Sequence, residues 1–234
     1  MDIQISNSPL ERIHRALEAE IDRGVRRIER AEKNGDPEYL DSVIDDECDE
    51  VEELLGIGFV AGQSFVNRVK SRLISLNRVC QDDFGGPLAL LASGKSPHVL
   101  LKYGGTFTET QFSAAEIVNG VANYWKHADE WTTCEVKANN RYIRTWDVSK
   151  MSPIQKGTVE LVSALGLSPG STGNLRDAAK IMGITKYQDL TPMRKELMAW
   201  AKNVYDMAAA DLNTLLRKSG RRSGKEKSGD NRDS

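Results

Sequence analysis

The chain has 234 residues, of which 39% are apolar, and it carries 32 Lys and Arg against 34 Asp and Glu. With a mean hydropathy of −0.47, this composition excludes collagen-like, membrane-spanning and disulfide-scaffold proteins. The longest apolar run, Leu88–Ala92, is far shorter than the roughly 18 residues that a membrane-spanning helix needs. We therefore expect no membrane association and a cytoplasmic location, in which the three widely spaced cysteines stay as free thiols.

Charge is distributed unevenly along the chain. Residues 36–53 contain ten acids and no base, whereas residues 217–234 contain seven bases and three acids. No apolar residue follows Leu216, so the last segment cannot bury surface to offset the entropy of ordering. We predict a helical domain over residues 8–217 and a disordered basic tail over 218–234, which either solubilises the protein or attracts nucleic acid weakly.

Two long helices are predicted to form an antiparallel hairpin in the N-terminal third of the chain. The first begins at Pro9 and shows apolar residues at steps of three and four until about Gly35. The second begins at Pro37 and keeps helical spacing to about Cys80. Its middle is weakened by three glycines, Gly56, Gly58 and Gly62. This segment is therefore either one long helix or two helices that meet at the glycines.

The two helices carry opposite charges on their polar faces. Arginines dominate the first, and His14 on the same side is expected to be exposed to solvent. The second carries acids at i+4 spacing, where like charges repel: Asp41, Asp45, Asp49 and Glu53. We expect the arginines of one helix to face the acids of the other. A solvated face, a basic protein partner and a divalent-metal site are alternative roles for the acids.

The rest of the chain is also predicted to be mostly helical. The breaker-rich segment 82–105 has room for short helical turns at 88–92 and 97–103. Residues 132–150 are rich in β-branched and aromatic side chains and form either a small β-hairpin or an irregular loop. Because the chain has neither an internal repeat nor an alternating βαβ rhythm, the predicted fold class is a mostly α helical bundle with a long N-terminal helical hairpin.

The helix that opens at Thr110 or Ser113 carries the one constellation with a chemical interpretation. Asn119, Asn123 and His127 lie four residues apart, so they share one helical face. Histidine donates and accepts protons near neutral pH, an amide one turn away can orient the imidazole, and Lys126 can stabilise charge on a phosphate. In this hypothesis, His127, Asn123 and Lys126 are catalytic residues of metal-independent RNA cleavage, and Asn119 binds substrate.

Two further features bear on this hypothesis. One histidine per chain cannot be acid and base at once, so a symmetric homodimer would supply the second copy. Arg141 and Arg144 alternate with aromatic residues, a pattern that suits single-stranded RNA but equally a loop with inward-packed aromatics. No cofactor is expected, and no metal, because the histidines and cysteines lack the spacing of zinc ligands.

A purely structural interpretation of the same residues is also open. The asparagines can bond across an interhelical contact, and His127 can tie its helix to the loop that follows. In that case the protein is a non-catalytic interaction module, of antitoxin or adaptor type, whose acidic helix face binds a basic partner.

The long helical hairpin followed by a helix with a polar residue a few positions before His127 resembles the HEPN superfamily. The resemblance covers roughly residues 8–131 and implies an all-α bundle that commonly dimerises. Many members are ribonucleases of defence and toxin–antitoxin systems, whereas others only bind. His127 matches the histidine of the family motif, but the arginine of that motif has no counterpart between Asn119 and Asn123. The stretch NYWKHADEW is also similar to the signature of a bacterial family to which no activity is attached.

Overall fold

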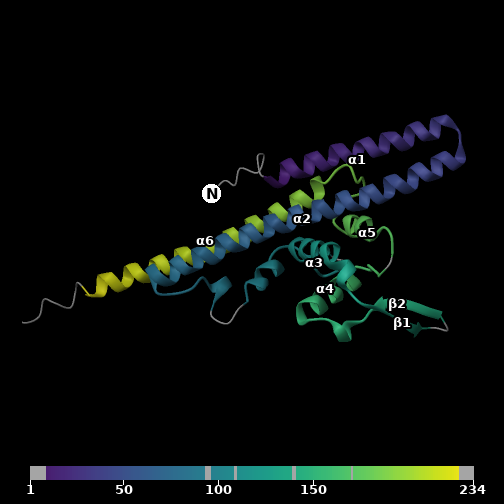
Figure 1. The fold of residues 1–234 in the computed structure, drawn as a ribbon. Helices are drawn as coiled ribbons and strands as arrows, with labels where there is room; N and C mark the ends of the chain where they lie inside the picture. Colours follow the sequence, from purple (N-terminus) through teal and green to yellow (C-terminus); the bar gives the residue numbers. More distant parts are fainter. Residues whose placement is uncertain (1–8, 93–95, 108–109, 139–140, 170, 227–234) are drawn as a thin grey trace, which may run out of the picture.

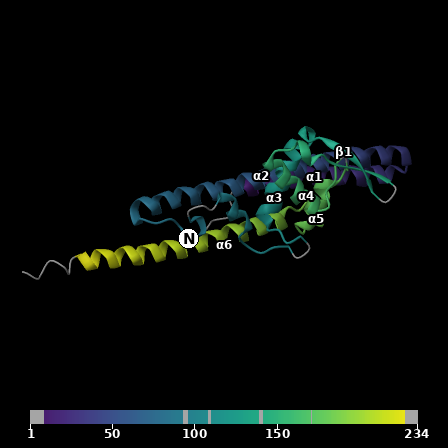
Figure 2. The same cartoon turned by 90° about the horizontal axis from the view of Figure 1, so that it is seen from below.

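The computed structural model describes residues 9–92, 96–107, 110–138, 141–169 and 171–226 (Figure 1). Helices α1 (Pro9–Asn34) and α2 (Pro37–Phe84) form the predicted antiparallel hairpin, and α6 (Thr191–Glu226) runs beside the second half of α2. The shorter helices α3 (Ala114–His127), α4 (Pro153–Ala164) and α5 (Asn174–Ile181) form a cluster on one side of this long frame (Figure 2). The predicted mostly α bundle is therefore confirmed.

Helix α2 is one continuous helix of 48 residues, which answers the question left open by its glycines. The Asp36 carboxylate caps its start by accepting hydrogen bonds from the backbone N–H groups of Glu38 (3.1 Å) and Tyr39 (3.4 Å). Gly85 ends the helix in the left-handed conformation with φ +68°. The helix is thus defined at both ends by local sequence, and its middle is supported by packing.

The glycines in the middle of α2 let α3 approach closely. A Cβ atom at Gly56 would lie 2.3 Å from the Trp125 indole, and one at Gly62 would lie 2.9 Å from Cγ1 of Val118. Both neighbours belong to α3, so side chains larger than hydrogen would push this helix away. The glycines therefore fix the distance between α3 and the frame, at the cost of some helix propensity.

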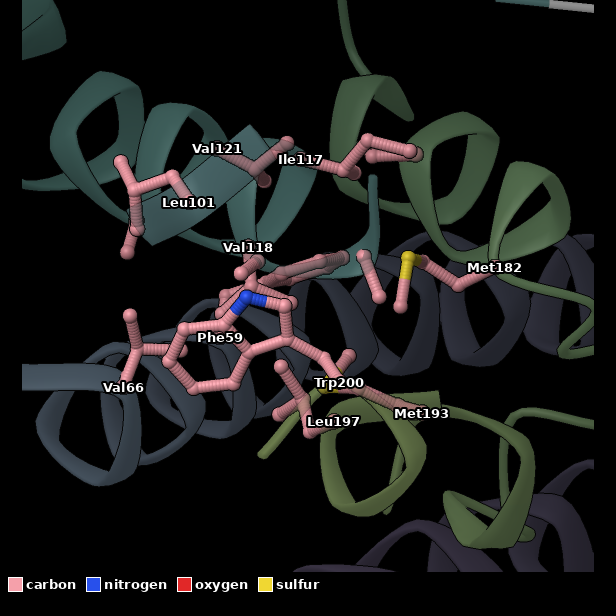
Figure 3. Packing of buried hydrophobic residues seen from close by; sticks show 14 of the residues in the cluster. Phe59, Val66, Leu101, Ile117, Val118, Val121, Met182, Met193, Leu197 and Trp200 are labelled. Atoms are coloured by element: carbon pink, nitrogen blue, oxygen red, sulfur yellow. The ribbon is translucent and has the colours of Figure 1, made fainter. Parts of the chain in front are cut away.

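The hydrophobic core lies where α2, α3 and α6 meet (Figure 3). Phe59 and Val66 come from α2, and Val118 from α3. The Trp200 indole of α6 is buried and donates a hydrogen bond to the Leu100 carbonyl at 2.9 Å, so its one polar group is satisfied. The same region holds other fully buried side chains: Ile117, Val121, Met193 and Leu197.

The described part of segment 132–150 contains the two paired strands of a β-hairpin, one of the two predicted forms. Strand β1 (Thr133–Ala138) pairs antiparallel with β2 (Arg141–Trp146), and the register places Val136 opposite Ile143. The expected helical turns appear as 3₁₀ segments, Ala89–Leu91 and Pro97–Lys102, and two more follow at Ala128–Glu130 and Val148–Lys150. No helix within the described ranges combines the length and apolar character that a bilayer crossing requires.

Helix α6 continues to Glu226, so residues 218–226 of the segment expected to be disordered are helical. Once a helix is established, each added residue contributes a hydrogen bond without a new nucleation cost, and Arg and Lys favour helix. Residues 227–234 of the expected tail lie outside the described residues.

The opposite charges of α1 and α2 meet at one arginine. Arg27 forms ion pairs with Glu47 and, at 2.7 Å, with Glu50. Glu52 turns elsewhere: it accepts hydrogen bonds from the Leu175 and Arg176 N–H groups and thus holds the start of α5. Glu47, Glu50 and Glu52 therefore have structural partners, whereas the other acids of α2 are exposed.

The prediction that His14 is exposed was wrong, because the side chain is completely buried. It lies between Leu10 and Leu17 on the face of α1 that packs against α2, and its Nε2 donates to the Gly58 carbonyl at 3.1 Å. Burial lowers the pKa of His14 to about 4, and the charge of Arg194 acts in the same direction. His14 is thus a neutral core residue that ties α1 to α2.

We expect this histidine to make folding sensitive to acid. Its pKa is about 4 when folded and 6.5 when unfolded, so the unfolded chain takes up the proton first as the pH falls. The free energy of unfolding should therefore fall between pH 6.5 and 4, by up to roughly 3 kcal/mol. Urea titrations across this range should show a shallower decline for His14→Gln, which can still donate to Gly58. Identical pH profiles for both proteins would contradict this role.

Candidate functional site

The polar row of α3 is held by a glutamine of α2. Gln63 is 6% exposed, and its Nε2 lies 3.1 Å from Oδ1 of Asn119 and 2.8 Å from Oδ1 of Asn123. Its Oε1 accepts a hydrogen bond from Nζ of Lys126 at 2.7 Å. Three of the predicted site residues are therefore brought together by one buried amide.

This arrangement changes the roles that the sequence suggested for the row. The Asn119 and Asn123 oxygens face Gln63, and the His127 imidazole is bonded to a different residue, Glu130. The row works as an interhelical contact, one of the two interpretations left open by the sequence. Nothing in the sequence around Gln63 signals this role, because an isolated glutamine in a long helix is ordinary.

His127 stands at the end of α3 and is oriented by a carboxylate. Its side chain is 46% exposed, and Nδ1 lies 3.1 Å from Oε1 of Glu130, which follows in the next turn. If Nδ1–H donates to Glu130, the neutral ring keeps the lone pair of Nε2 for a proton. Glu130 thus has the role of orienting the imidazole, which the sequence suggested for an asparagine one turn away.

A small cavity of about 180 Å³ opens beside His127. Its walls come from the end of α3, from the residues that follow it and from α4, which contributes Ile154, Gln155 and Thr158. The start of α4 is fixed by a capping box, in which Ser152 accepts from the Gln155 N–H and Gln155 accepts from the Ser152 N–H. The imidazole therefore borders a defined hollow in the surface.

A second cavity, of about 430 Å³, shares Trp131 with the first as a lining residue. Its aromatic wall consists of Tyr124, Trp131 and Trp146, whose ring centroids are 5.8–6.2 Å apart. Arg144 also lines it and donates from Nε to Oγ1 of Thr133 at 3.1 Å. The rings pack against one another, so a ligand would contact the cluster from outside.

The two arginines and their aromatic neighbours separate in space. Arg141 and Arg144 are exposed on β2, Tyr142 is 71% exposed, and Trp146 is buried. Each interpretation therefore fits one of the two aromatic residues: Trp146 is packed inward, and Tyr142 projects from the hairpin. Among the described residues, no group of three or more His, Cys, Asp or Glu is placed to hold a metal ion.

We expect Gln63 to contribute to stability through these contacts. Gln63→Leu keeps the volume but leaves two amide oxygens and an ammonium without their partner, so the free energy of unfolding should drop by about 1–2 kcal/mol. Urea denaturation measures the drop. Ser64→Ala is the neighbouring control, because Ser64 is exposed and its hydroxyl bonds to the Val60 carbonyl of its own helix. A Gln63→Leu protein as stable as wild type would contradict the role of the network.

Comparisons with protein-family models, with curated proteins and with solved structures gave no match. What the chain does is therefore inferred from its own side chains and their geometry.

Proposed function

We propose that the protein acts on RNA at the end of α3, with His127 as the group that accepts a proton. The observation that carries the proposal is the pairing of an exposed imidazole with Glu130 at 3.1 Å beside a defined cavity. A carboxylate on Nδ1 keeps Nε2 in its accepting form, which is the requirement for a general base. The resemblance to the HEPN superfamily points to the same substrate and to a defence or toxin-type role.

The surroundings of His127 suit a polyanion with exposed bases. Arg144 borders the cavity next to that of His127, and Arg141 and Tyr142 extend along the same hairpin. Arginines can contact phosphates, and an exposed tyrosine offers a face on which a base can stack. Lys126, held on Gln63 at 2.7 Å, adds a positive charge one residue from His127.

The reaction is cleavage by the 2′-hydroxyl of the RNA itself. Nε2 of His127 takes the proton of the 2′-hydroxyl, the 2′-oxygen bonds to the adjacent phosphorus, and the bond from phosphorus to the 5′-oxygen breaks. The products are a 2′,3′-cyclic phosphate and a 5′-hydroxyl, which must receive a proton. Since His127 cannot donate a proton while it accepts one, we propose that a second copy of the chain supplies the acid.

A second candidate function is a non-catalytic interaction module with a basic protein partner. The observation that favours it is the α2 surface at the far end of the helical hairpin, where four acids are exposed and form no ion pair within the described ranges: Asp41, Asp45, Asp49 and Glu53. The hydrogen bonds from Gln63 to Asn119 and Asn123 also favour this function, because these amide oxygens are already bonded within the protein. In either function we place the protein in the cytoplasm, where its thiols stay reduced.

An RNA-cleavage assay with the purified full chain tests the first proposal. Wild type should cleave a single-stranded RNA with or without a metal chelator, and should leave the same sequence intact when the 2′-hydroxyls are missing. His127→Ala should reduce the rate by about 100-fold or more, and Glu130→Gln should reduce it less, because the base remains but loses its orientation. His98→Ala is the matched control, since His98 is exposed and lies outside both cavities.

Equal rates in wild type and His127→Ala, or no cleavage by wild type, would overturn the catalytic proposal. The double variant Asp45→Asn, Asp49→Asn should leave RNA cleavage unchanged. Under the second candidate, the same double variant should instead release a co-purifying basic protein that His127→Ala retains.

A further inference from the structure

The β-hairpin leaves both of its edges unpaired. The sheet has two strands within the described ranges, and the hairpin projects from the helical cluster (Figure 1). An unpaired strand presents a row of N–H and C=O groups that can pair with another strand. A two-stranded hairpin is also marginally stable by itself, so added strands would stabilise it.

The register identifies which backbone groups of β1 point outward. Asp147 N–H donates to the Thr132 carbonyl at 2.8 Å directly before the ladder, and Thr133 pairs with Trp146 next. Hydrogen-bonded and non-hydrogen-bonded pairs alternate in an antiparallel ladder. The groups of Val136 therefore point to β2, whereas those of Glu135 and Lys137 point to the open edge.

The side chains along this edge are complementary to themselves under two-fold symmetry. If β1 pairs antiparallel with β1 of a second copy around Val136, Glu135 of each chain lies opposite Lys137 of the other. Both residues are exposed, and neither forms an ion pair in the described part of the chain. The register that centres on Glu135 or on Lys137 would place like charges opposite each other, which is unfavourable.

The other face of the hairpin supplies apolar contact in the same register. Val136 and Ile143 lie opposite each other and are 48% and 53% exposed. Pairing around Val136 would join the two pairs into one apolar row across four strands. Strand β2 lacks this complementarity, because it carries Arg141 and Arg144 and no acid.

We propose that the protein forms a two-fold symmetric dimer by pairing the β1 edges of two copies in the register centred on Val136. In this pairing the outward backbone groups of Glu135 and Lys137 form hydrogen bonds between the two copies. Two salt bridges form on one face of the sheet, and one apolar row forms on the other. The interface is small, so the dimer dissociates on dilution. No residue of β1 lines the cavity beside His127, so failure of this dimer and failure of RNA cleavage at His127 are distinguishable.

Sedimentation of the full chain over a dilution series tests the proposal. Wild type should shift from dimer to monomer on dilution. Glu135→Lys and Lys137→Glu should each weaken the dimer by roughly tenfold or more, because each places like charges opposite one another twice. An equimolar mixture of these two variants should associate again, since the edge that carries two lysines then pairs with the edge that carries two glutamates.

The mixing step separates a lost interface from a damaged hairpin, because an unfolded hairpin cannot be rescued by a second variant. Glu160→Lys on α4, also an exposed glutamate, is the matched control and should dimerise as wild type does. Wild type that stays monomeric at every concentration, single variants that dimerise like wild type, or a mixture that stays monomeric would each overturn the proposed register.

Discussion

The close approach of α3 to the glycine-bearing middle of α2 determines where the polar row of the candidate site lies. Trp125 lies against Gly56, and Val118 lies against Gly62, at distances that exclude a Cβ atom. The same stretch of α2 receives His14 of α1 at the Gly58 carbonyl. Two glycine contacts with α3 and one backbone hydrogen bond from α1 thus hold these helices against the middle of α2. A larger residue at Gly56 or Gly62 would favour helix formation locally but would collide with Trp125 or Val118 of α3.

Polar contacts also hold the shorter helices against the long frame. Gln63, one residue after Gly62, links α2 to Asn119, Asn123 and Lys126. Glu52 and Glu18 hold the starts of α5 and α6 through backbone N–H groups, and Glu18 also pairs with Arg194 at 2.6 Å. Of these contacts, those of Gln63 hold the C-terminal half of α3, and His127 at its end has its ring bonded to Glu130.

The sequence predicted elements well where local signals define them. The prolines Pro9, Pro37 and Pro153 mark helix starts that the structure confirms, and of the two starts left open for α3, Thr110 and Ser113, the structure has Ser113 as the cap. Prediction from the sequence failed where a partner from a distant segment determines the environment of a side chain. His14 was expected to be exposed because imidazole is polar, although it falls on the stripe that contains Leu10 and Leu17. The Gly58 carbonyl of α2, which accepts its hydrogen bond, makes burial of the ring tolerable, and the local sequence does not show this partner. Gln63 and Glu130 gave no signal, since their roles depend on which side chains the fold brings within reach.

The central claim is that Glu130 holds His127 with its proton on Nδ1, leaving Nε2 able to accept another. Nitrogen NMR of the three histidine side chains distinguishes the two neutral tautomers directly. We predict that neutral His127 is protonated on Nδ1 and that Glu130→Gln reduces this preference, while buried His14 stays protonated on Nε2 in both proteins. A neutral His127 protonated mainly on Nε2, unaffected by Glu130→Gln, would contradict the assignment of this ring as a base.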